Sequence, residues 1–407
     1  MPKVLQVNSG INWGSTGRIA EGIGLEAMEQ GWDSYIAYAN SHTPSESHAI
    51  HIGSKYNFYI HAFQTRVFDR QGLSSKNATK EFIKRVEEIR PDVIHLHNIH
   101  GYYLNYPLFF EYLKERQYPV FWTLHDCWPF TGHCSHFIGC GCERWKTGCF
   151  NCPQKRAYPS SYVFDRSRKN YLDKRASFTS IENLTLIPVS SWLSNLIQES
   201  FFKRKKIHVI HNGVDLNTFK VKNNRNQVCS KYGINPNKKI ILGVASVWDK
   251  CKGLDDFMKL RELLSDEYTI VTVGVAKEQI AKFPTGMIGI SRTNNVDDLA
   301  NLYSASHVFL NPTYVDNFPT TNIEALACGC PVITYKTGGS PEAIDSRTGR
   351  VCEQGDVHSL AGLVKEIAES PNHIDFRMSA RQRVMQCFDK KVKFLEYVKL
   401  YNESILL

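Results

Sequence analysis

The 407-residue chain lacks any long uninterrupted apolar run. No stretch reaches the roughly 18 residues that a membrane-spanning helix needs. The first ten residues contain no basic segment followed by a long apolar core, so we expect no signal peptide. The sequence also has no internal repeat, no low-complexity basic tail and none of the common nucleic-acid-binding motifs. We therefore expect neither an integral membrane protein nor a nucleic-acid partner.

The composition is that of a globular protein, with 42% hydrophobic and 22% charged residues. A chain of this length can bury substantial cores in two or so domains. Twelve cysteines without a secretion signal favour a reduced cytoplasmic setting over a disulfide scaffold. The net charge of +9 suits phosphorylated substrates or an anionic membrane surface.

Strand-like apolar runs alternate with helical segments in both halves of the chain, which predicts α/β structure with parallel sheets. The expected strands are residues 3–7, 33–39, 93–96, 120–124, 184–189, 207–211, 240–244, 268–273, 287–290, 307–310 and 332–335. The main expected helices are residues 19–30, 81–89, 108–116, 190–200, 254–264, 296–304, 321–327, 357–368, 375–387 and 390–402. Residues 41–80 have little pattern, with helical pieces expected near residues 58–68. The polar residues 222–239 are expected to form a domain edge.

The most informative stretch runs from Asn311 to Glu342, where a strand, a loop, a short helix and another strand follow one another. The first amides of a helix have no partner within it and can receive an anion, and Pro319, Thr320 and Thr321 place such amides at a strand end. Glu324 lies one turn into the helix. The spacing alone leaves a second interpretation open, in which Thr321 and Glu324 form only a capping box and the preceding loop only a turn.

The whole phrase resembles the nucleotide-sugar-binding motif of the family 4 retaining glycosyltransferases. The matching residues are Asp316, Asn317, Phe318, Pro319, Glu324 to Ala327, Gly329, Pro331 to Ile333 and Gly338 to Glu342. The resemblance implies the GT-B architecture, in which two Rossmann-like domains face each other across a cleft. The family usually has two glutamates eight positions apart, and here the first is Asp316, one methylene shorter.

The resemblance also implies the domain boundaries. We expect an N-terminal acceptor-side domain over residues 1–210, with a cysteine-rich insertion at 127–153. A C-terminal nucleotide-sugar-binding domain would cover residues 211–388, and residues 389–407 would form a helix that crosses back to the first domain. The phrase from Asn212 to Phe219 resembles the family's crossover between the domains.

The N-terminal half contains two groups of candidate site residues. Gly14, Gly17 and Arg18 resemble the first loop, which faces the donor diphosphate, although a tight turn explains the glycines as well. His125 and Asp126 follow a predicted strand, where ligands of open α/β sheets bind. The context resembles that of the histidine that the family places beside the transferring sugar; the alternative is a histidine in a surface turn.

Three further histidines, His95, His97 and His100, cluster at the end of an expected strand. One interpretation is a metal site. The favoured interpretation is a strand end near the cleft that binds no metal.

The family typically grips the leaving diphosphate with an arginine and a lysine. Lys252, before Gly253, matches the lysine, and Lys250 is the candidate substitute for the arginine; without the resemblance, both would be explained as an exposed loop. The implied roles are diphosphate binding by Lys250, Lys252 and the helix amides, ribose binding by Glu324 and sugar binding by Asp316. No metal is expected at the reaction centre.

The cysteine-rich insertion contains a Cys149-x-x-Cys152 half-site of the kind that binds tetrahedral zinc, with further thiols upstream. The predicted structural zinc ligands are Cys134, Cys142, Cys149 and Cys152, in a segment that resembles an insertion of a subset of these transferases. His133 or His136 could replace one ligand. The alternative is a set of free or redox-active cysteines.

A basic run, Lys203 to Lys206, follows Phe201 and Phe202 and suggests contact with an anionic membrane, although a solvated helix end explains it too.

The predicted function is that of a retaining, hexosyltransferase-like enzyme that moves a sugar from a UDP- or GDP-sugar to a glycan or lipid-linked acceptor. The resemblance implies bacterial surface polysaccharide assembly, in the cytoplasm or at the inner face of the membrane. Two alternatives remain: a nucleotide-sugar epimerase or hydrolase of the same fold, and a non-catalytic zinc-containing module that binds nucleic acid.

Overall fold

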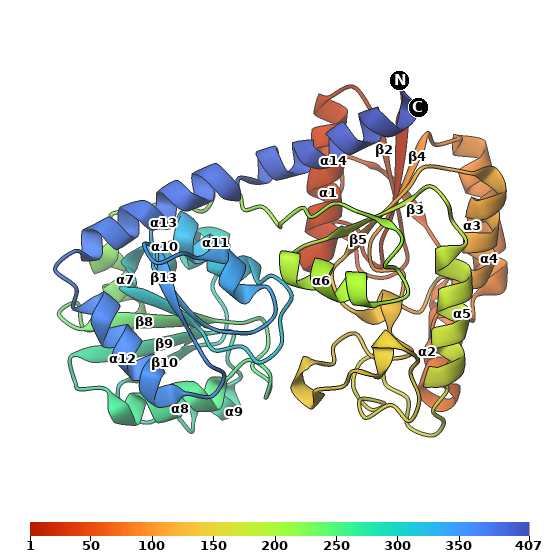
Figure 1. Ribbon diagram of the computed structural model, residues 1–407. Coiled ribbons are helices and arrows are strands. Elements are labelled where there is room, and N and C mark those ends of the chain that lie inside the picture. Colours follow the sequence, from red (N-terminus) through yellow and green to blue (C-terminus); the bar gives the residue numbers. More distant parts are fainter. Residues whose placement is uncertain (407) are drawn as a thin grey trace. The chain divides into compact units, whose positions relative to one another are not determined.

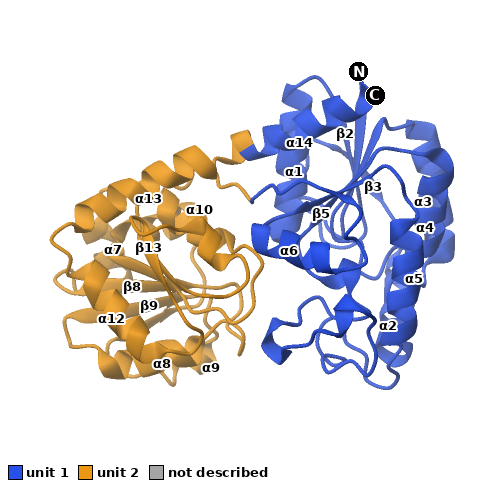
Figure 2. Ribbon diagram, in the orientation of Figure 1, with its two compact units in different colours: residues 1–211, 393–407 blue, residues 212–392 orange. Residues whose placement is uncertain are grey.

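The computed structural model describes residues 1–406, which form two compact units (Figures 1 and 2). Unit 1 consists of residues 1–211 and 393–407, and unit 2 of residues 212–392. The sequence had suggested divisions after residues 210 and 388. Within the described residues, no helix is both long enough and apolar enough to cross a membrane.

Unit 1 is built on a seven-stranded parallel sheet with the order β3-β2-β1-β4-β5-β6-β7. Its strands are β1 (Lys3–Val7), β2 (Asp33–Tyr38), β3 (His48–His51), β4 (Val93–Leu96), β5 (Val120–Leu124), β6 (Leu184–Pro188) and β7 (Lys206–Ile207). The strand order reverses between β1 and β4, and ligands of such open sheets bind at the carboxyl ends of the strands at this point. The candidate residues of unit 1 follow these strands.

Helices flank the sheet of unit 1 (Figure 1). They are α1 (Gly14–Glu29), α2 (Lys55–Phe68), α3 (Lys76–Ile89), α4 (Tyr106–Arg116), α5 (Ser167–Thr179), α6 (Ser191–Glu199) and the second part of α14 (Lys390–Ile405). Every residue of β4, β5 and β6 is buried, as expected for parallel strands covered on both faces.

The last helix, α14, packs its apolar face into the core of unit 1. Tyr397 and Tyr401 lie in one buried cluster with Val4 of β1 and Phe121 of β5. A Cβ atom at Gly22 of α1 would lie 2.2 Å from the ring of Phe394, so only glycine permits this approach of α1 to α14. The division between the units falls within α14, between residues 392 and 393.

Unit 2 contains a six-stranded parallel sheet with the order β10-β9-β8-β11-β12-β13. Its strands are β8 (Lys239–Val244), β9 (Tyr268–Val273), β10 (Met287–Ile290), β11 (Val308–Asn311), β12 (Val332–Tyr335) and β13 (Gly349–Cys352). Its helices are α7 (Arg225–Tyr232), α8 (Leu254–Leu263), α9 (Lys277–Ile280), α10 (Val296–Ala305), α11 (Thr320–Ala327), α12 (Val357–Ala368) and α13 (His373–Cys387). Both units therefore have the Rossmann-like architecture that the sequence predicted.

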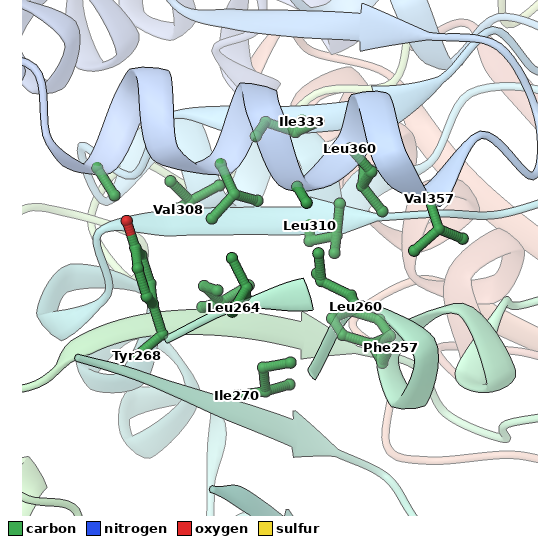
Figure 3. Close-up of a cluster of buried hydrophobic side chains, with 14 of the residues drawn as sticks. Phe257, Leu260, Leu264, Tyr268, Ile270, Val308, Leu310, Ile333, Val357 and Leu360 are labelled. Atoms are coloured by element: carbon green, nitrogen blue, oxygen red, sulfur yellow. The ribbon is translucent and has the colours of Figure 1, made fainter. Parts of the chain in front are cut away.

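The core of unit 2 lies between its sheet and helices α8 and α12 (Figure 3). Phe257 and Leu260 of α8 and Leu360 of α12 are fully buried against Leu310 and Ile333 of the sheet. Burial of each such side chain stabilises the fold by about 1.5–3 kcal/mol. This packing holds the carboxyl ends of β8, β11 and β12 in place, and the candidate residues of unit 2 lie in the loops that follow them.

The structure differs from the sequence prediction mainly in polar segments. The strands β3 and β13 and the helices α5, α7 and α9 were not predicted. Helix α1 begins at Gly14 rather than after Arg18, α3 begins at Lys76 rather than at 81, and β7 spans two residues rather than five. Strand β3 is mostly exposed and α7 buries only Val228 and Cys229, so neither has the apolar period from which an element can be predicted.

Candidate active site

Two loops of unit 2 bring together Lys252, which is predicted to bind the diphosphate, and Asp316, which is predicted to bind the sugar. The Nζ atom of Lys252, in the loop after β8, lies 2.9 Å from Oδ2 of Asp316, in the loop after β11. The loops are joined by their backbones, since the Tyr314 amide donates to the Cys251 carbonyl at 2.8 Å. The lysine and aspartate side chains are 33% and 22% exposed, so both can reach a ligand.

Two glycines make this approach of the loops possible. Gly253 has φ +75°, and a Cβ atom there would lie 2.2 Å from the carbonyl oxygen of Pro312. Gly338, after β12, has φ +52°, and its Cβ would lie 1.9 Å from the carbonyl oxygen of Asp316. Because other residues disfavour both the backbone angle and the contact, these glycines fix three loops at one edge of the sheet.

Helix α11 begins with an N-cap at Pro319 that, in the described structure, forms no side-chain cap hydrogen bond. The capping box of Thr321 and Glu324, which the sequence left open, is therefore not formed. Glu324 instead accepts a hydrogen bond from the hydroxyl of buried Tyr303, at 3.2 Å, and remains partly exposed. The helix presents its first turn, with Thr320 and Thr321 partly exposed, beside the loop that holds Asp316.

The other predicted donor ligands of unit 2 lie in different surroundings. Phe318 is buried, and its ring packs on Phe388 with 5.6 Å between the ring centroids. Its carbonyl accepts a hydrogen bond from the Asn212 side chain at 3.3 Å, and Asn317 is also buried. Phe318 therefore shapes the loop after β11. Lys250 lies in the loop after β8, two positions before Lys252, and is exposed.

In unit 1, Gly14 and Gly17 lie in the first turn of α1, and Arg18 begins the second turn. None of the three lies in the loop before the helix. Gly14 has φ +66° and is exposed. A Cβ at Gly17 would lie 3.1 Å from the Gly10 carbonyl oxygen, so this glycine keeps the loop close to the helix. Arg18 is exposed and available to an anion.

His125, directly after β5, is held by a chain of hydrogen bonds through neighbouring strands. Its Nε2 lies 3.2 Å from Nδ1 of His97, which follows β4. Nε2 of His97 lies 3.0 Å from Oε1 of Gln6, in the middle of β1. The amide Nε2 of Gln6 donates to the carbonyl of Ala20, in α1, at 2.8 Å.

This chain of bonds sets the tautomer of His125. Because the Gln6 amide nitrogen donates to a carbonyl, its Oε1 is an acceptor, and Nε2 of His97 must carry the proton. The Nδ1 of neutral His97 then accepts from Nε2–H of His125, which leaves Nδ1 of His125 as an acceptor. Burial is the main cause that lowers the pKa of His125 to about 4, and burial also lowers the pKa of His97 well below its usual value. Both rings are therefore neutral near pH 7.

Asp126 faces His100, with Oδ2 2.8 Å from Nε2 of that ring. Although burial alone would raise its pKa, the charge and hydrogen bond of His100 lower the pKa of Asp126 to about 2. The other nitrogen of His100 lies 3.1 Å from the hydroxyl of Tyr158. Asp126 also accepts a hydrogen bond from the Trp128 amide at 2.9 Å, so it orients the turn after His125.

The structure gives the remaining histidine, His95, a place in the core. It is fully buried, hydrogen-bonds Thr123 at 2.7 Å and also contacts the Tyr401 hydroxyl.

Within residues 1–406, no group of three or more His, Cys, Asp or Glu side chains is arranged to hold a metal ion. Sequence reasoning missed Gln6 and Tyr158; a glutamine amid the apolar residues of β1 was the one available signal for the first.

The cysteines predicted as zinc ligands lie around one small cavity, which is lined by Cys134, Cys142, Cys149 and Cys152 together with His133. The Gly132 amide donates to Sγ of Cys149 at 3.1 Å. A hydrogen bond from Cys134 is the main cause that lowers the pKa of Cys152 to about 7. Cys140 is exposed and is not among the lining residues. The structural zinc stays a prediction.

One of the two aromatic residues of the predicted membrane surface, Phe202, is not available, whereas Phe201 is half-buried. Phe202 is fully buried and packs against Trp122 and Phe178. Lys205 donates to the carbonyl of Ile181, and burial lowers its pKa. The exposed cations at 203, 204 and 206 and the half-buried ring of Phe201 are left for an anionic surface.

Comparison with known proteins identifies the class of protein. The family model "Glycosyltransferase Family 4" matches residues 17–218, and the family model "Glycosyl transferases group 1" matches residues 224–384. Together they account for both units, so the chain belongs to the glycosyltransferases that these models describe. The protein is a glycosyltransferase, and the resemblance found in the sequence is confirmed.

The relatives and the structural neighbours agree with this assignment. The chain is 26% identical over 389 residues to the "Putative colanic acid biosynthesis glycosyl transferase WcaC" of Escherichia coli, with 90% of this chain and 91% of the relative covered. It is similar in fold to a sucrose-phosphate synthase from Thermosynechococcus elongatus, with TM-score 0.73, 16% identity and 99% of both chains covered. It is also similar to Anabaena Alr3699/HepE in complex with UDP, with TM-score 0.69, 15% identity and coverage of 99% and 100%.

Proposed function

We propose that this glycosyltransferase moves a hexosyl group from a nucleoside diphosphate sugar, with UDP as the first candidate nucleotide, to a glycan or lipid-linked acceptor. We further propose that the transfer retains the anomeric configuration and contributes to polysaccharide assembly. The observation that carries the proposal is the pairing of Lys252 with Asp316 beside the start of α11. The names of two similar proteins support it, since one is assigned to colanic acid biosynthesis and another was solved with UDP.

The chemical difficulty is departure of the diphosphate. The bond between the sugar C1 and the phosphate oxygen breaks, and its electron pair moves to the diphosphate. The acceptor hydroxyl oxygen bonds to C1 on the face that the diphosphate leaves, and the hydroxyl proton passes to the departing phosphate oxygen. Positive charge aimed at the leaving group lowers this barrier most, because negative charge there grows in the transition state.

The residues of unit 2 have the chemistry for donor binding. Lys252 and the amides at the start of α11 would bind the diphosphate, with Lys250 at the rim. Glu324, held by Tyr303, would accept hydrogen bonds from the ribose hydroxyls. Asp316 would bind hydroxyls of the transferring sugar. A mechanism with these groups needs no metal at the reaction centre, because the lysine and the helix amides supply the positive charge.

In unit 1, the proposed role of His125 follows from its assigned tautomer. A neutral ring with Nδ1 as acceptor can receive a hydrogen bond from a sugar or acceptor hydroxyl, and it has no proton on that nitrogen to donate. We assign His125 this role, Asp126 the role of orienting the turn through His100, and Gly14, Gly17 and Arg18 contact with the donor diphosphate.

A thermal-shift titration with UDP-, GDP- and ADP-sugars tests the donor class, because a ligand that binds the folded state raises its apparent stability. We expect a UDP-sugar to raise the midpoint and UDP alone to do so as well. NMR of the product's anomeric proton then gives the stereochemistry. No shift with any nucleotide sugar would contradict the proposed donor, and an inverted product would contradict retention. Rapid release of free sugar without acceptor would instead indicate a hydrolase.

A further inference from the structure

Unit 1 contains a pocket of about 640 Å³ at the carboxyl ends of its central strands. Its walls include Ser9, which follows β1, Tyr38, which ends β2, and Gly101, in the segment after β4. Lys55, Phe58 and Tyr59 of α2 also line the pocket. The pocket therefore lies at the edge of the sheet where the strand order reverses, which is the usual ligand position in this topology.

A continuous series of aromatic rings forms one wall of the pocket. Phe58 lies 5.6 Å from Tyr59 and 5.6 Å from Tyr102, and Tyr102 lies 6.2 Å from Tyr158, between ring centroids and in edge-to-face geometry each time. Tyr59 and Tyr158 are 68% and 45% exposed. Tyr38 faces His51 at 5.2 Å and adds a further ring. Single exposed aromatic rings are common on protein surfaces. Several exposed rings around one pocket indicate a binding surface.

The polar groups of the pocket are neutral or cationic. Lys55, His42 and His51 are among its lining residues, and the described lining includes no aspartate or glutamate. Asn40 is fixed by a hydrogen bond from its side chain to the Gly101 carbonyl, at 2.9 Å. A ligand with an apolar face, several hydroxyls and no positive charge fits this lining.

Tyr158 connects the pocket to the predicted catalytic corner. Its hydroxyl contacts His100 at 3.1 Å, and His100 holds Asp126, next to His125. Tyr158 lies five residues after the end of the cysteine-rich insertion, and no residue of the insertion itself is among the described lining residues.

We propose that this pocket binds a sugar ring of the acceptor glycan, and this inference rests on the proposed function. The apolar face of a pyranose packs on the exposed ring of Tyr59, its hydroxyls meet the polar strand-end residues, and Lys55 favours a sugar that carries a carboxylate.

Saturation-transfer NMR with the full-length protein and simple methyl glycosides tests the pocket. The probes are the methyl glycosides of glucose, galactose, fucose and glucuronic acid. We expect saturation of the ring protons of at least one probe, and an about five-fold weaker signal with Tyr59→Ala, which corresponds to loss of one aromatic contact. Tyr59→Phe should keep the signal.

The control is Tyr56→Ala. Tyr56 lies three positions earlier in α2, is 72% exposed and does not line the pocket. Equal signals for Tyr59→Ala and Tyr56→Ala, or no signal for any probe with the parent protein, would overturn the proposal. Lys55→Met should weaken glucuronide binding alone; an unchanged glucuronide signal would refute the role of Lys55. UDP titration separates the two proposals. A protein that binds glycosides but no UDP would support the sugar-binding pocket and contradict the proposed donor.

Discussion

Lys252 and Asp316 form an ion pair of 2.9 Å although 64 residues separate them in the chain. Both side chains are partly exposed, and such pairs contribute only about 0–1 kcal/mol to stability. The pair is therefore easily opened by a ligand. Under the proposed function, a diphosphate replaces Asp316 as the partner of Lys252 and Asp316 binds the sugar. The ion pair would then hold both groups in position before the donor binds.

Glu324→Ala should weaken UDP binding about tenfold or more and nearly abolish transfer, because a carboxylate that holds two ribose hydroxyls is lost. Calorimetric titration with UDP and a thermal unfolding curve are the measurements. Tyr303→Phe is the matched control, since it removes only the hydroxyl that supports Glu324. Unchanged UDP affinity in Glu324→Ala would show that this residue does not bind the ribose.

Asp316→Glu should be tolerated or increase turnover, because glutamate is the usual residue of the family at this position. The longer side chain still reaches Lys252 from the same loop. Steady-state transfer assays on the purified variant give the answer. A folded but inactive variant would show that the site is shaped around the shorter side chain.

Lys252→Ala should lower kcat more than it lowers donor affinity, because the charge on the diphosphate grows as the bond breaks. Kinetics and UDP titration measure the two effects separately. Lys282→Ala, an exposed lysine of the same unit, is the control for the loss of one charge. Equal losses in kcat and in affinity would assign Lys252 to ground-state binding.

Stability should fall as the pH drops from about 6.5 towards 4. Burial lowers the pKa of His125 to about 4, and it also lowers those of His95 and His97, so the unfolded chain binds these protons first. The stabilising effect of the neutral rings is complete above the unfolded pKa and is lost as the pH passes through the folded values. Thermal unfolding at a series of pH values measures this slope, and His97→Asn should reduce it. A midpoint independent of pH over this range would contradict the hydrogen-bonded neutral chain.

The protein should contain about one zinc ion per chain if the four cysteines at the insertion cavity form a closed site. Metal analysis of protein purified without added zinc measures this, and Cys149→Ser should lower the content. Exposed Cys140 provides the matched control, since Cys140→Ser should leave the zinc content unchanged. Absence of zinc together with free titration of all thiols in the folded state would end this hypothesis.

The sequence by itself determined the fold class and the elements from β11 to β12. The segment of β11, its loop, α11 and β12 is local, and its apolar runs, breakers and glycines specify it within about thirty residues. Strands buried on both faces of a sheet leave continuous apolar runs in the sequence, and such runs have clear ends. The predicted strands β9, β10 and β12 therefore have the predicted bounds.

The tertiary structure alone decided which distant side chains meet. Only the folded chain joins Gln6 to His97, ninety-one residues later, and through it fixes the tautomer of His125. Only the fold aligns Phe58, Tyr102 and Tyr158 as one wall, and only the fold buries Phe202, which the sequence had placed at a membrane surface. The physical reason is that contacts between distant strands or helices depend on the strand order of the sheet and on side-chain packing. Neither of these leaves a local pattern in the sequence.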